Sequence, residues 1–379
     1  MSAPSPAAPA SAVTGARSRL DETLLWLCSI ASPIGEERAL CDAVQARIGR
    51  LPLAAPVRRY GDSIVVPVTR GTGGPKIALV GHLDTVRTEN GPARIDAGRC
   101  FGAGASDMKS GLAVMIELTE RLALPALGAI AAGLDLTLVF YAREEGPYED
   151  NELGPVLSQD PELSRVDLAA CLEPSDNKLH LGCMGSVHAT VTFVGRTAHS
   201  ARPWEGDNAV TQSAGLLAEL SALRPVESVI EGLTYRSTTT LTQARDGGRG
   251  RNVVPDRFVL NLNHRFTPDR TLGDAVAYVC ALVGERAEVQ IIDRSPAARP
   301  GAGHPLVAAL VAAGVRAVEP KQAWTDVARF SALGIPAVNF GPGENAQAHQ
   351  KNESTDLALV HEGQAILERW LASVARPRV

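Results

Sequence analysis

The sequence predicts an α/β protein, in which a mostly parallel sheet is flanked by helices and a smaller α+β domain is inserted. Apolar, strand-like runs such as residues 76–84 and 134–144 alternate with amphipathic helical patterns such as residues 108–123. This alternation is typical of parallel sheets that are covered by helices on both faces. After Leu179 the pattern changes to period-two alternation, which is typical of antiparallel strands with one solvated face.

The order of these patterns predicts one domain inserted into another. Helical periodicity covers residues 20–51 with a break at Pro33, and α/β texture returns from residue 304 to the C-terminus. Between these parts we expect a two-layer sandwich, with two helices on one face of a four-stranded sheet. The expected boundaries are a disordered lead-in at residues 1–18, the larger domain at residues 19–181 and 294–379, and the inserted domain at residues 182–293.

Composition excludes several classes of protein. The net charge is −5 and no dense Lys/Arg tract occurs, so we expect no nucleic-acid partner. The sequence contains no run of about 18 apolar residues, so we expect no membrane-spanning segment. The Ala-, Pro- and Ser-rich start lacks the features of a secretory signal. The six cysteines form no CxxC pair, which indicates reduced thiols and a cytoplasmic location.

Side chains of metal-ligand type stand where the predicted strands end, at the edge where open α/β sheets place their ligands. They are His82, Asp84, Asp107, Glu144, Glu145, Glu173 and His349. Nitrogen and carboxylate oxygen together suit zinc or a similar divalent ion. Each motif has an ordinary alternative when taken alone: a structural histidine, a helix cap or a solvated acidic turn. Their common placement at one sheet edge favours a metal site.

In chain order these motifs resemble the co-catalytic di-zinc amidohydrolases. This family includes aminoacylases, carboxypeptidases, acetylornithine deacetylases and succinyl-diaminopimelate desuccinylases. The resemblance runs from about residue 20 to the C-terminus, and its last part is most similar to the actinobacterial-type desuccinylases. The motifs are "GHLDTV", "GAGASDMKSGLAV", "REEG", "LEPS", "GRTAHSARPWEGDNA", "RNVVPD", "WTDVARFSALGIPAVNFGPG" and "NFGPGENAQAH".

The resemblance implies a zinc-exopeptidase-like catalytic domain with two Zn²⁺ per subunit, a site that Co²⁺ or Mn²⁺ can share. It implies that Asp107 bridges the ions, that His82 and Glu173 complete the first, and that Glu145 and His349 complete the second. Glu144 is then the general base and acid, and Asp84 supports His82. His199 would reach the active site of a second subunit, so the inserted domain is expected to be both a lid and the contact of a homodimer.

The implied substrate is a small anionic acyl-amino acid, N-succinyl-LL-2,6-diaminopimelate, which carries three carboxylates. The resemblance points to substrate contacts at Asn252, Arg265, Thr325 and Asn345. It also points to Arg202, for which a plain solvated arginine is an equal alternative. The chain departs from the family at "GCMGS", where Cys183 and Met184 stand in place of a basic pair.

Three rival hypotheses remain. A related deacylase or dipeptidase, such as an acetylornithine deacetylase, would hydrolyse a similar amide. A nucleotide-binding protein is disfavoured, because "GPGENA" opens no convincing helix within a βαβ unit. A metal-free homologue is disfavoured because the full set of expected ligands is present.

Overall fold

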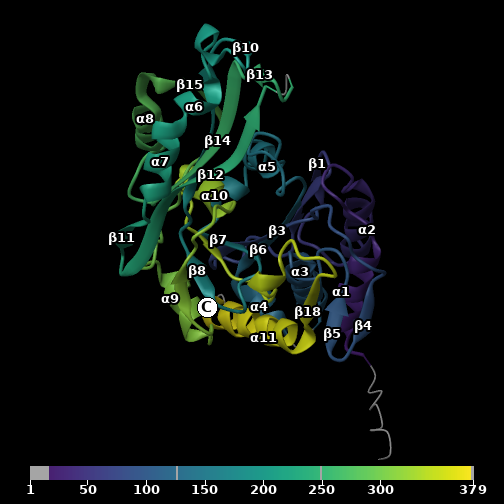
Figure 1. Cartoon of the computed structure of the whole chain (residues 1–379). Helices are drawn as coiled ribbons and strands as arrows, with labels where there is room; N and C mark the ends of the chain where they lie inside the picture. Colours follow the sequence, from purple (N-terminus) through teal and green to yellow (C-terminus); the bar gives the residue numbers. More distant parts are fainter. Residues whose placement is uncertain (1–16, 125–126, 248–249, 377–379) are drawn as a thin grey trace, which may run out of the picture.

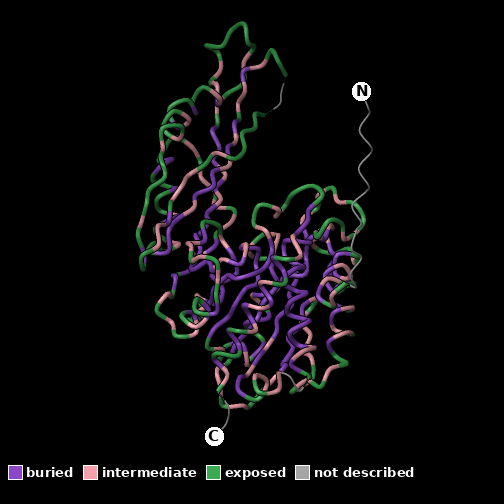
Figure 2. The backbone as a smooth tube through the Cα atoms, turned by 90° about the horizontal axis from the view of Figure 1, so that it is seen from below, coloured by how far each residue is buried: buried purple, intermediate pink, exposed green. Residues whose placement is uncertain are grey.

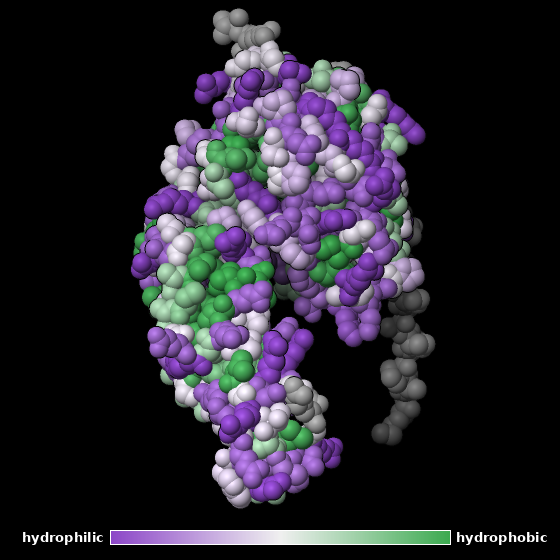
Figure 3. Space-filling view, turned by 90° about the horizontal axis from the view of Figure 1, so that it is seen from above, coloured by the Kyte–Doolittle hydropathy of each residue, from purple (hydrophilic) through white to green (hydrophobic). Residues whose placement is uncertain are grey.

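Two separate sheets organise the molecule, and the smaller one projects from the body as a lobe (Figures 1 and 3). The computed structural model describes residues 17–124, 127–247 and 250–376. Most of the expected lead-in at residues 1–18 therefore lies outside the described residues. The α/β class with an inserted α+β lobe is confirmed by these two sheets.

The large sheet has eight strands, and its central strands run parallel. β3 pairs in parallel with β6 and β7, and β7 pairs in parallel with β17. Antiparallel pairs occur toward the two edges. In spatial order the strands are β1 (Arg58–Tyr60), β2 (Ser63–Pro67), β6 (Asp135–Tyr141), β3 (Lys76–His82), β7 (Leu168–Cys171), β17 (Ala337–Asn339), β8 (Leu179–Leu181) and β16 (Val318–Pro320).

Helices cover both faces of the large sheet, which explains why its strands are continuously apolar. Successive residues of a strand point to opposite faces, so Leu79 packs in one core and Val80 in the other. Figure 2 shows this doubly buried region in purple. One face is covered by α1 (Arg19–Ser29), α2 (Arg38–Ile48), α3 (Lys109–Leu122), α4 (Gly128–Gly133), α9 (Pro305–Ala312) and α11 (Leu357–Val374), and the other by α5 (Leu153–Gln159) and α10 (Val327–Ala332).

The small sheet is antiparallel and has five strands, so the expected number of four is wrong. The additional hairpin turns at Glu231 and Gly232, which both have positive φ. Because Glu-Gly is not the usual hairpin signal, the sequence pattern did not reveal this turn. The order is β11 (Val226–Ile230), β12 (Leu233–Asp246), β14 (Arg257–Phe266), β9 (Gly185–Val194) and β15 (Glu288–Ser295), packed against α6 (Ala209–Gln212), α7 (Ala214–Ala222) and α8 (Leu272–Val283).

Two minor sheets complete the fold. One joins β10 (Ala198–His199) to β13 (Val253–Val254) at the tip of the lobe (Figure 1). The other joins β18 (Ser354–Asp356), β5 (Arg99–Phe101) and β4 (Arg94–Asp96) beside the large sheet. The second of these matters for the site, because it ties the end of the chain to the segment that precedes α3.

The chain enters and leaves the lobe through two neighbouring segments. Cys183 and Ala298 form an isolated antiparallel bridge. Gly182 has φ +58°, and a Cβ there would lie 2.7 Å from the carbonyl oxygen of Ala298, so glycine suits this crossing. The expected domain boundaries at residues 182 and 293 stay a prediction, while the small sheet itself runs from Gly185 to Ser295.

The cysteines agree with the expectation of reduced thiols. All six are free, and Cys280 is the exposed one. Within the described residues, no helix combines the length and apolarity that crossing a bilayer requires.

Candidate metal centre

The centre is built where β3 and β6 end side by side, because these strands run parallel and in register from Lys76 to His82. His82 is the last residue of β3 and is buried. Its Nδ1 lies 3.0 Å from the carbonyl oxygen of Asp84, which fixes the ring and turns Nε2 toward Asp107. Such a hydrogen bond on one ring nitrogen is what leaves the other free to bind a metal.

Asp107 lies between two histidines that are far apart in the sequence. Its Oδ1 is 3.2 Å from His82 Nε2, and its Oδ2 is 3.6 Å from His349 Nε2. His349 Nε2 is also 2.9 Å from Glu145 Oε1. Ligand atoms of His82, Asp107 and Glu145 lie within 4.8 Å of one another. One carboxylate that faces two imidazoles in this way can contact two ions at once.

The carboxylate of Asp84 holds the two adjacent glutamates in place through their backbone amides. The Glu144 amide donates to Asp84 Oδ1 at 3.0 Å, and the Glu145 amide donates to Oδ2 at 2.8 Å. Arg143, which precedes them, has φ +64° and reverses the chain at this point. The sequence led us to expect only that Asp84 supports His82. Its carboxylate is in fact 3.5 Å from His82 Nδ1 and anchors the glutamate pair as well.

Glu173 follows β7 and completes the concentration of acids. Its Oε1 is buried and has no hydrogen-bond partner among the described residues. A buried carboxylate oxygen without a partner is costly, so it is a position that a cation would satisfy. Glu144 and Glu173 both line a cavity that lies in front of these acids. Together with the nitrogen and oxygen donors around Asp107, this oxygen makes the site fit divalent metal ions.

Electrostatics at the centre record an excess of negative charge. Burial raises the pKa of Glu173 to about 7, and it raises the pKa of Glu144 well above its usual value. The hydrogen bond with Glu145 raises the pKa of His349 to about 9. Burial works against a charged His82, but hydrogen bonds with Asp107 and Asp84 outweigh it and raise the pKa of that ring. A raised pKa on two carboxyl groups and on both histidines indicates a place where positive charge is favoured.

Glu353 is a positioning residue that the sequence pattern did not reveal. It is 2% exposed, and its carboxylate accepts hydrogen bonds of 2.8 Å from the backbone amides of Gly104, Ser106 and Asp107. The segment that carries Asp107 is therefore held by a residue almost 250 positions later. The only available signal was its place four residues after His349.

The cavity in front of these acids has a volume of about 380 Å³ and is walled by both sheets. Thr325 and Asn345 line it from the large-sheet side, and Arg265 lines it from β14. Arg265 Nε donates to Asn263 Oδ1 at 2.9 Å, and burial lowers the pKa of its guanidinium. Three of the five expected substrate contacts thus lie in one cavity with the metal-ligand side chains.

Two further charged residues of this cavity were missed. A β-bulge at Ile292 shifts the register of β15, so that Asp293 pairs with His188 and shares its face. Without the extra residue, Asp293 would follow Ile291 onto the opposite, helix-covered face. Lys321, directly after β16, is the second. Neither the bulge nor the strand-end lysine leaves a periodic signal in the sequence.

The other three expected residues lie apart from the cavity, at the tip of the lobe. The Ser200 amide donates to the Asn252 carbonyl, and the Arg202 amide donates to the His199 carbonyl. His199 and Arg202 are exposed, and both belong to the region of β10 (Figure 1). Within one copy of the chain, His199, Arg202 and Asn252 therefore form a group of their own.

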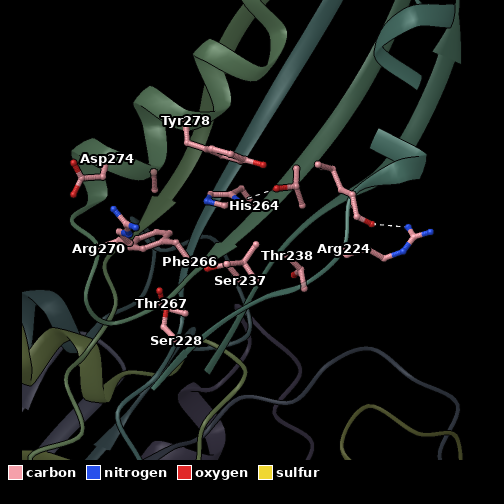
Figure 4. Close-up of a pocket in the computed structure, with 14 residues that line it drawn as sticks. Arg224, Ser228, Ser237, Thr238, His264, Phe266, Thr267, Arg270, Asp274 and Tyr278 are labelled. Atoms are coloured by element: carbon pink, nitrogen blue, oxygen red, sulfur yellow. Dashed lines mark hydrogen bonds between the residues drawn. The ribbon is translucent and has the colours of Figure 1, made fainter. Parts of the chain in front are cut away.

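A second cavity of about 300 Å³ lies within the lobe and contains none of the expected site residues (Figure 4). Its wall includes the stacked rings of His264 and Tyr278, whose centroids are 4.5 Å apart. Arg224 and Val226 bound it where α7 leads into the edge strand β11. It holds no cluster of acids and histidines among the residues that line it, so metal chemistry belongs to the first cavity.

Comparison with known proteins agrees with this geometry. Residues 78–373 match the family described as peptidase family M20/M25/M40. A succinyl-diaminopimelate desuccinylase of Corynebacterium glutamicum is 35% identical over 353 residues, which are 91% of this chain and 94% of that protein. A succinyl-diaminopimelate desuccinylase of Rhodospirillum centenum is 30% identical over 358 residues, 87% of this chain and 89% of that protein.

Solved structures share the fold at lower identity. A tripeptidase of Staphylococcus aureus superposes with a TM-score of 0.77 at 20% identity, covering 94% of this chain and 98% of that one. A dinuclear metal-binding peptidase of Bacillus subtilis has a TM-score of 0.69 at 13% identity, covering 95% and 98%. The family match spans most of the chain, from within β3 to near the end of α11. The chain belongs to the peptidase family M20/M25/M40.

Proposed function

We propose that this protein is a metal-dependent amide hydrolase that cleaves N-succinyl-LL-2,6-diaminopimelate to succinate and LL-diaminopimelate, in diaminopimelate and lysine biosynthesis. The observation that carries the proposal is the group around Asp107, where two histidines and several carboxylates come together beside one cavity. The similarity to desuccinylases along nine-tenths of the chain supports the choice of substrate. A cytoplasmic location is part of the same proposal.

Two Zn²⁺ ions fit the donor set best in this proposal, and Co²⁺ or Mn²⁺ could share it. His82 and Glu173 would hold one ion, Glu145 and His349 the other, and Asp107 both. The geometry in support is that each oxygen of Asp107 faces a different histidine. When bound, such ions supply Lewis-acid activation of water and of the amide carbonyl.

Glu144 carries the proton in this mechanism. Its carboxylate faces the cavity, while its backbone is fixed by Asp84. Burial favours the protonated form of Glu144 and raises its pKa, which suits a group that takes a proton from water and later gives it to the leaving amine. Its neighbour Glu145 is engaged by His349, so the two adjacent acids have different tasks.

The test of this assignment is Glu144→Gln, with Glu149→Gln as a control in the same loop. Glu149 is exposed and does not line the cavity. We expect Glu144→Gln to keep its metal content and to lose at least about 100-fold in kcat, because general acid–base catalysis contributes on that order. Full activity of this variant would contradict the role of Glu144.

A related deacylase or dipeptidase is the alternative function. Turnover of succinyl-diaminopimelate, acetylornithine and simple dipeptides by one zinc-loaded preparation separates the candidates. Arg265, Thr325 and Asn345 are the proposed contacts of the substrate within the same subunit. Preference for acetylornithine or for a dipeptide would overturn the proposed substrate and leave the metal centre in place.

A homodimer through the lobe would bring the remaining residues to the cavity. We assign His199, with Asn252 and Arg202, to the active site of a second copy, because the three lie together away from the cavity of their own subunit. The edge strand β11 offers an unpaired side, where Val226 is 65% and Val229 72% exposed. The apolar area visible on the lobe and the adjacent second cavity also favour a covered surface (Figures 3 and 4).

Co-expression of Glu144→Gln with His199→Ala tests this arrangement. Each variant alone should be nearly inactive. A mixed dimer would contain one complete site, which combines the Glu144 of one subunit with the His199 of the other. Random pairing should then restore about a quarter of the activity, as expected for a two-fold dimer. Failure to restore activity in isolated mixed dimers would contradict a contribution from the second copy.

A further inference from the structure

Lys321 is a buried lysine in the active-site cavity whose ammonium group has no partner among the described residues. It follows β16 directly, is 9% exposed, and lines the cavity together with Glu173 and Thr325. Its backbone amide donates to the carbonyl oxygen of Leu181 at 3.3 Å, which ties it to the end of β8. In the described part of the chain, its ammonium group makes no hydrogen bond and no ion pair.

The ammonium group of Lys321 reaches the open space of the cavity, so an anion that enters the cavity can pair with it. Burial is the largest influence on the pKa of Asp107 and of Glu173 and raises that of Glu173 overall, but the positive charge of Lys321 acts in the opposite direction on both, so Lys321 lies close enough to affect them. It is not within ion-pair distance of either, and metal ions would engage those two carboxylates. Lys321 would therefore remain available for an anion that arrives from outside.

The segment next to Lys321 offers no second positive charge to the cavity. Cys183 and Met184 follow the end of β8, and both are fully buried and neutral. Arg265, on the opposite wall formed by the lobe, is the other lysine or arginine side chain that lines the cavity. Lys321 on the large-sheet side of the cavity and Arg265 on the lobe side match a substrate that carries more than one carboxylate.

We infer that Lys321 is a specificity-determining residue that binds a substrate carboxylate not involved in the reaction. This inference rests on the proposed function and adds the residue that recognises the anionic substrate from the large-sheet side. Two sources of that carboxylate share the same chemistry. One is the terminal carboxylate of the succinyl group, and the other is an α-carboxylate of diaminopimelate.

The experiment compares Lys321→Met and Lys321→Arg with Lys76→Met, which removes a charge from an exposed lysine at the start of β3. Three amides separate the two sources: succinyl-diaminopimelate, its N-butyryl analogue without the acyl carboxylate, and N-succinyl-1,5-diaminopentane without the α-carboxylates. Metal content is measured for each protein. Binding of succinate and of diaminopimelate is measured by calorimetry, independently of turnover.

We expect Lys321→Met to raise KM for succinyl-diaminopimelate by about 10- to 100-fold, as for loss of a charged hydrogen bond, with metal content and kcat little changed. The KM for the analogue that lacks the recognised carboxylate should not change, and binding of the matching product should weaken. Lys321→Arg should keep most of the affinity, and Lys76→Met should behave as the unaltered enzyme.

Two other results have different meanings. An equal loss with all three amides, or a loss of bound metal, would show that Lys321 only balances the charge of the carboxylate cluster, and would overturn the inference. Absence of turnover of succinyl-diaminopimelate by the unaltered, metal-loaded enzyme would contradict the proposed function instead. In that case unchanged product binding by Lys321→Met would also overturn the inference, and weaker binding would support it.

Discussion

The carboxylate of Glu353 offers the sharpest test of how the metal centre is positioned. In the structure Oε1 accepts the amides of Ser106 and Asp107, and Oε2 accepts the amide of Gly104, each at 2.8 Å. Glu353→Gln keeps the size of the side chain, but its NH₂ group replaces one acceptor by a donor. Whichever way the amide turns, at least one backbone N–H then faces an N–H group instead of an oxygen.

The size of the effect follows from these contacts. Burial raises the pKa of Glu353 to about 7, so above that pH the three amides donate to a charged carboxylate. A hydrogen bond to a charged group contributes about 1.5–3 kcal/mol, and a buried donor left without an acceptor costs about 1–3 kcal/mol. Because Glu353 is 2% exposed, water does not compensate for the loss. We therefore expect the free energy of unfolding of the metal-free protein to fall by about 2–3 kcal/mol. Metal affinity should fall by about 10- to 100-fold, as for residues that hold metal ligands in place.

The assay is a metal titration by competition with a chelator, together with urea unfolding of the metal-free protein. Glu344→Gln is the control, since Glu344 also belongs to the loop around His349 but pairs with Arg99 and accepts a single backbone amide, from Asp356, at a partly exposed position. Glu353→Gln with metal affinity and unfolding midpoint equal to the unaltered protein would refute the reasoning that three amides depend on this carboxylate.

Other predictions concern Asp84 and His180. Asp84→Asn leaves one oxygen for the two amides of Glu144 and Glu145. We therefore expect metal affinity to fall by about 10-fold or more and kcat to fall with it. Unchanged values in a metal titration and a turnover assay would argue against the role of Asp84 in holding the two glutamates. His180 is 7% exposed, and burial lowers its pKa to about 4, with Lys321 also acting against its charge. In the unfolded protein His180 takes up a proton near pH 6.5, whereas in the folded protein it does so only near pH 4. The contribution of His180 to the free energy of unfolding is therefore complete above pH 6.5, and about 3 kcal/mol is lost as the pH falls from 6.5 to 4. His180→Gln should flatten this part of the acid dependence of the urea midpoint, and an identical slope in both proteins would show that His180 is not responsible.

Much of the fold and of the metal centre could be predicted from the sequence, for a physical reason. Strands buried on both faces are continuously apolar, as in Leu79 and Val80, so the strands of the large sheet can be recognised locally. Parallel strands end at one edge, so the amino-acid order alone was enough to predict that His82 and Glu145 approach each other.

The residues that hold and complete that centre could not be predicted, because they are brought there by contacts between distant parts of the chain. Glu353 acts across almost 250 positions, Asp293 reaches the cavity because of a bulge, and Lys321 reaches it because β16 pairs with β8. Such placements depend on long-range pairing and on local backbone geometry, which leave no periodic pattern in the chain. The amino-acid order predicts the chemical groups and the sheet edge where they gather, whereas the folded backbone sets their distances, their partners and which charged side chains line the cavity.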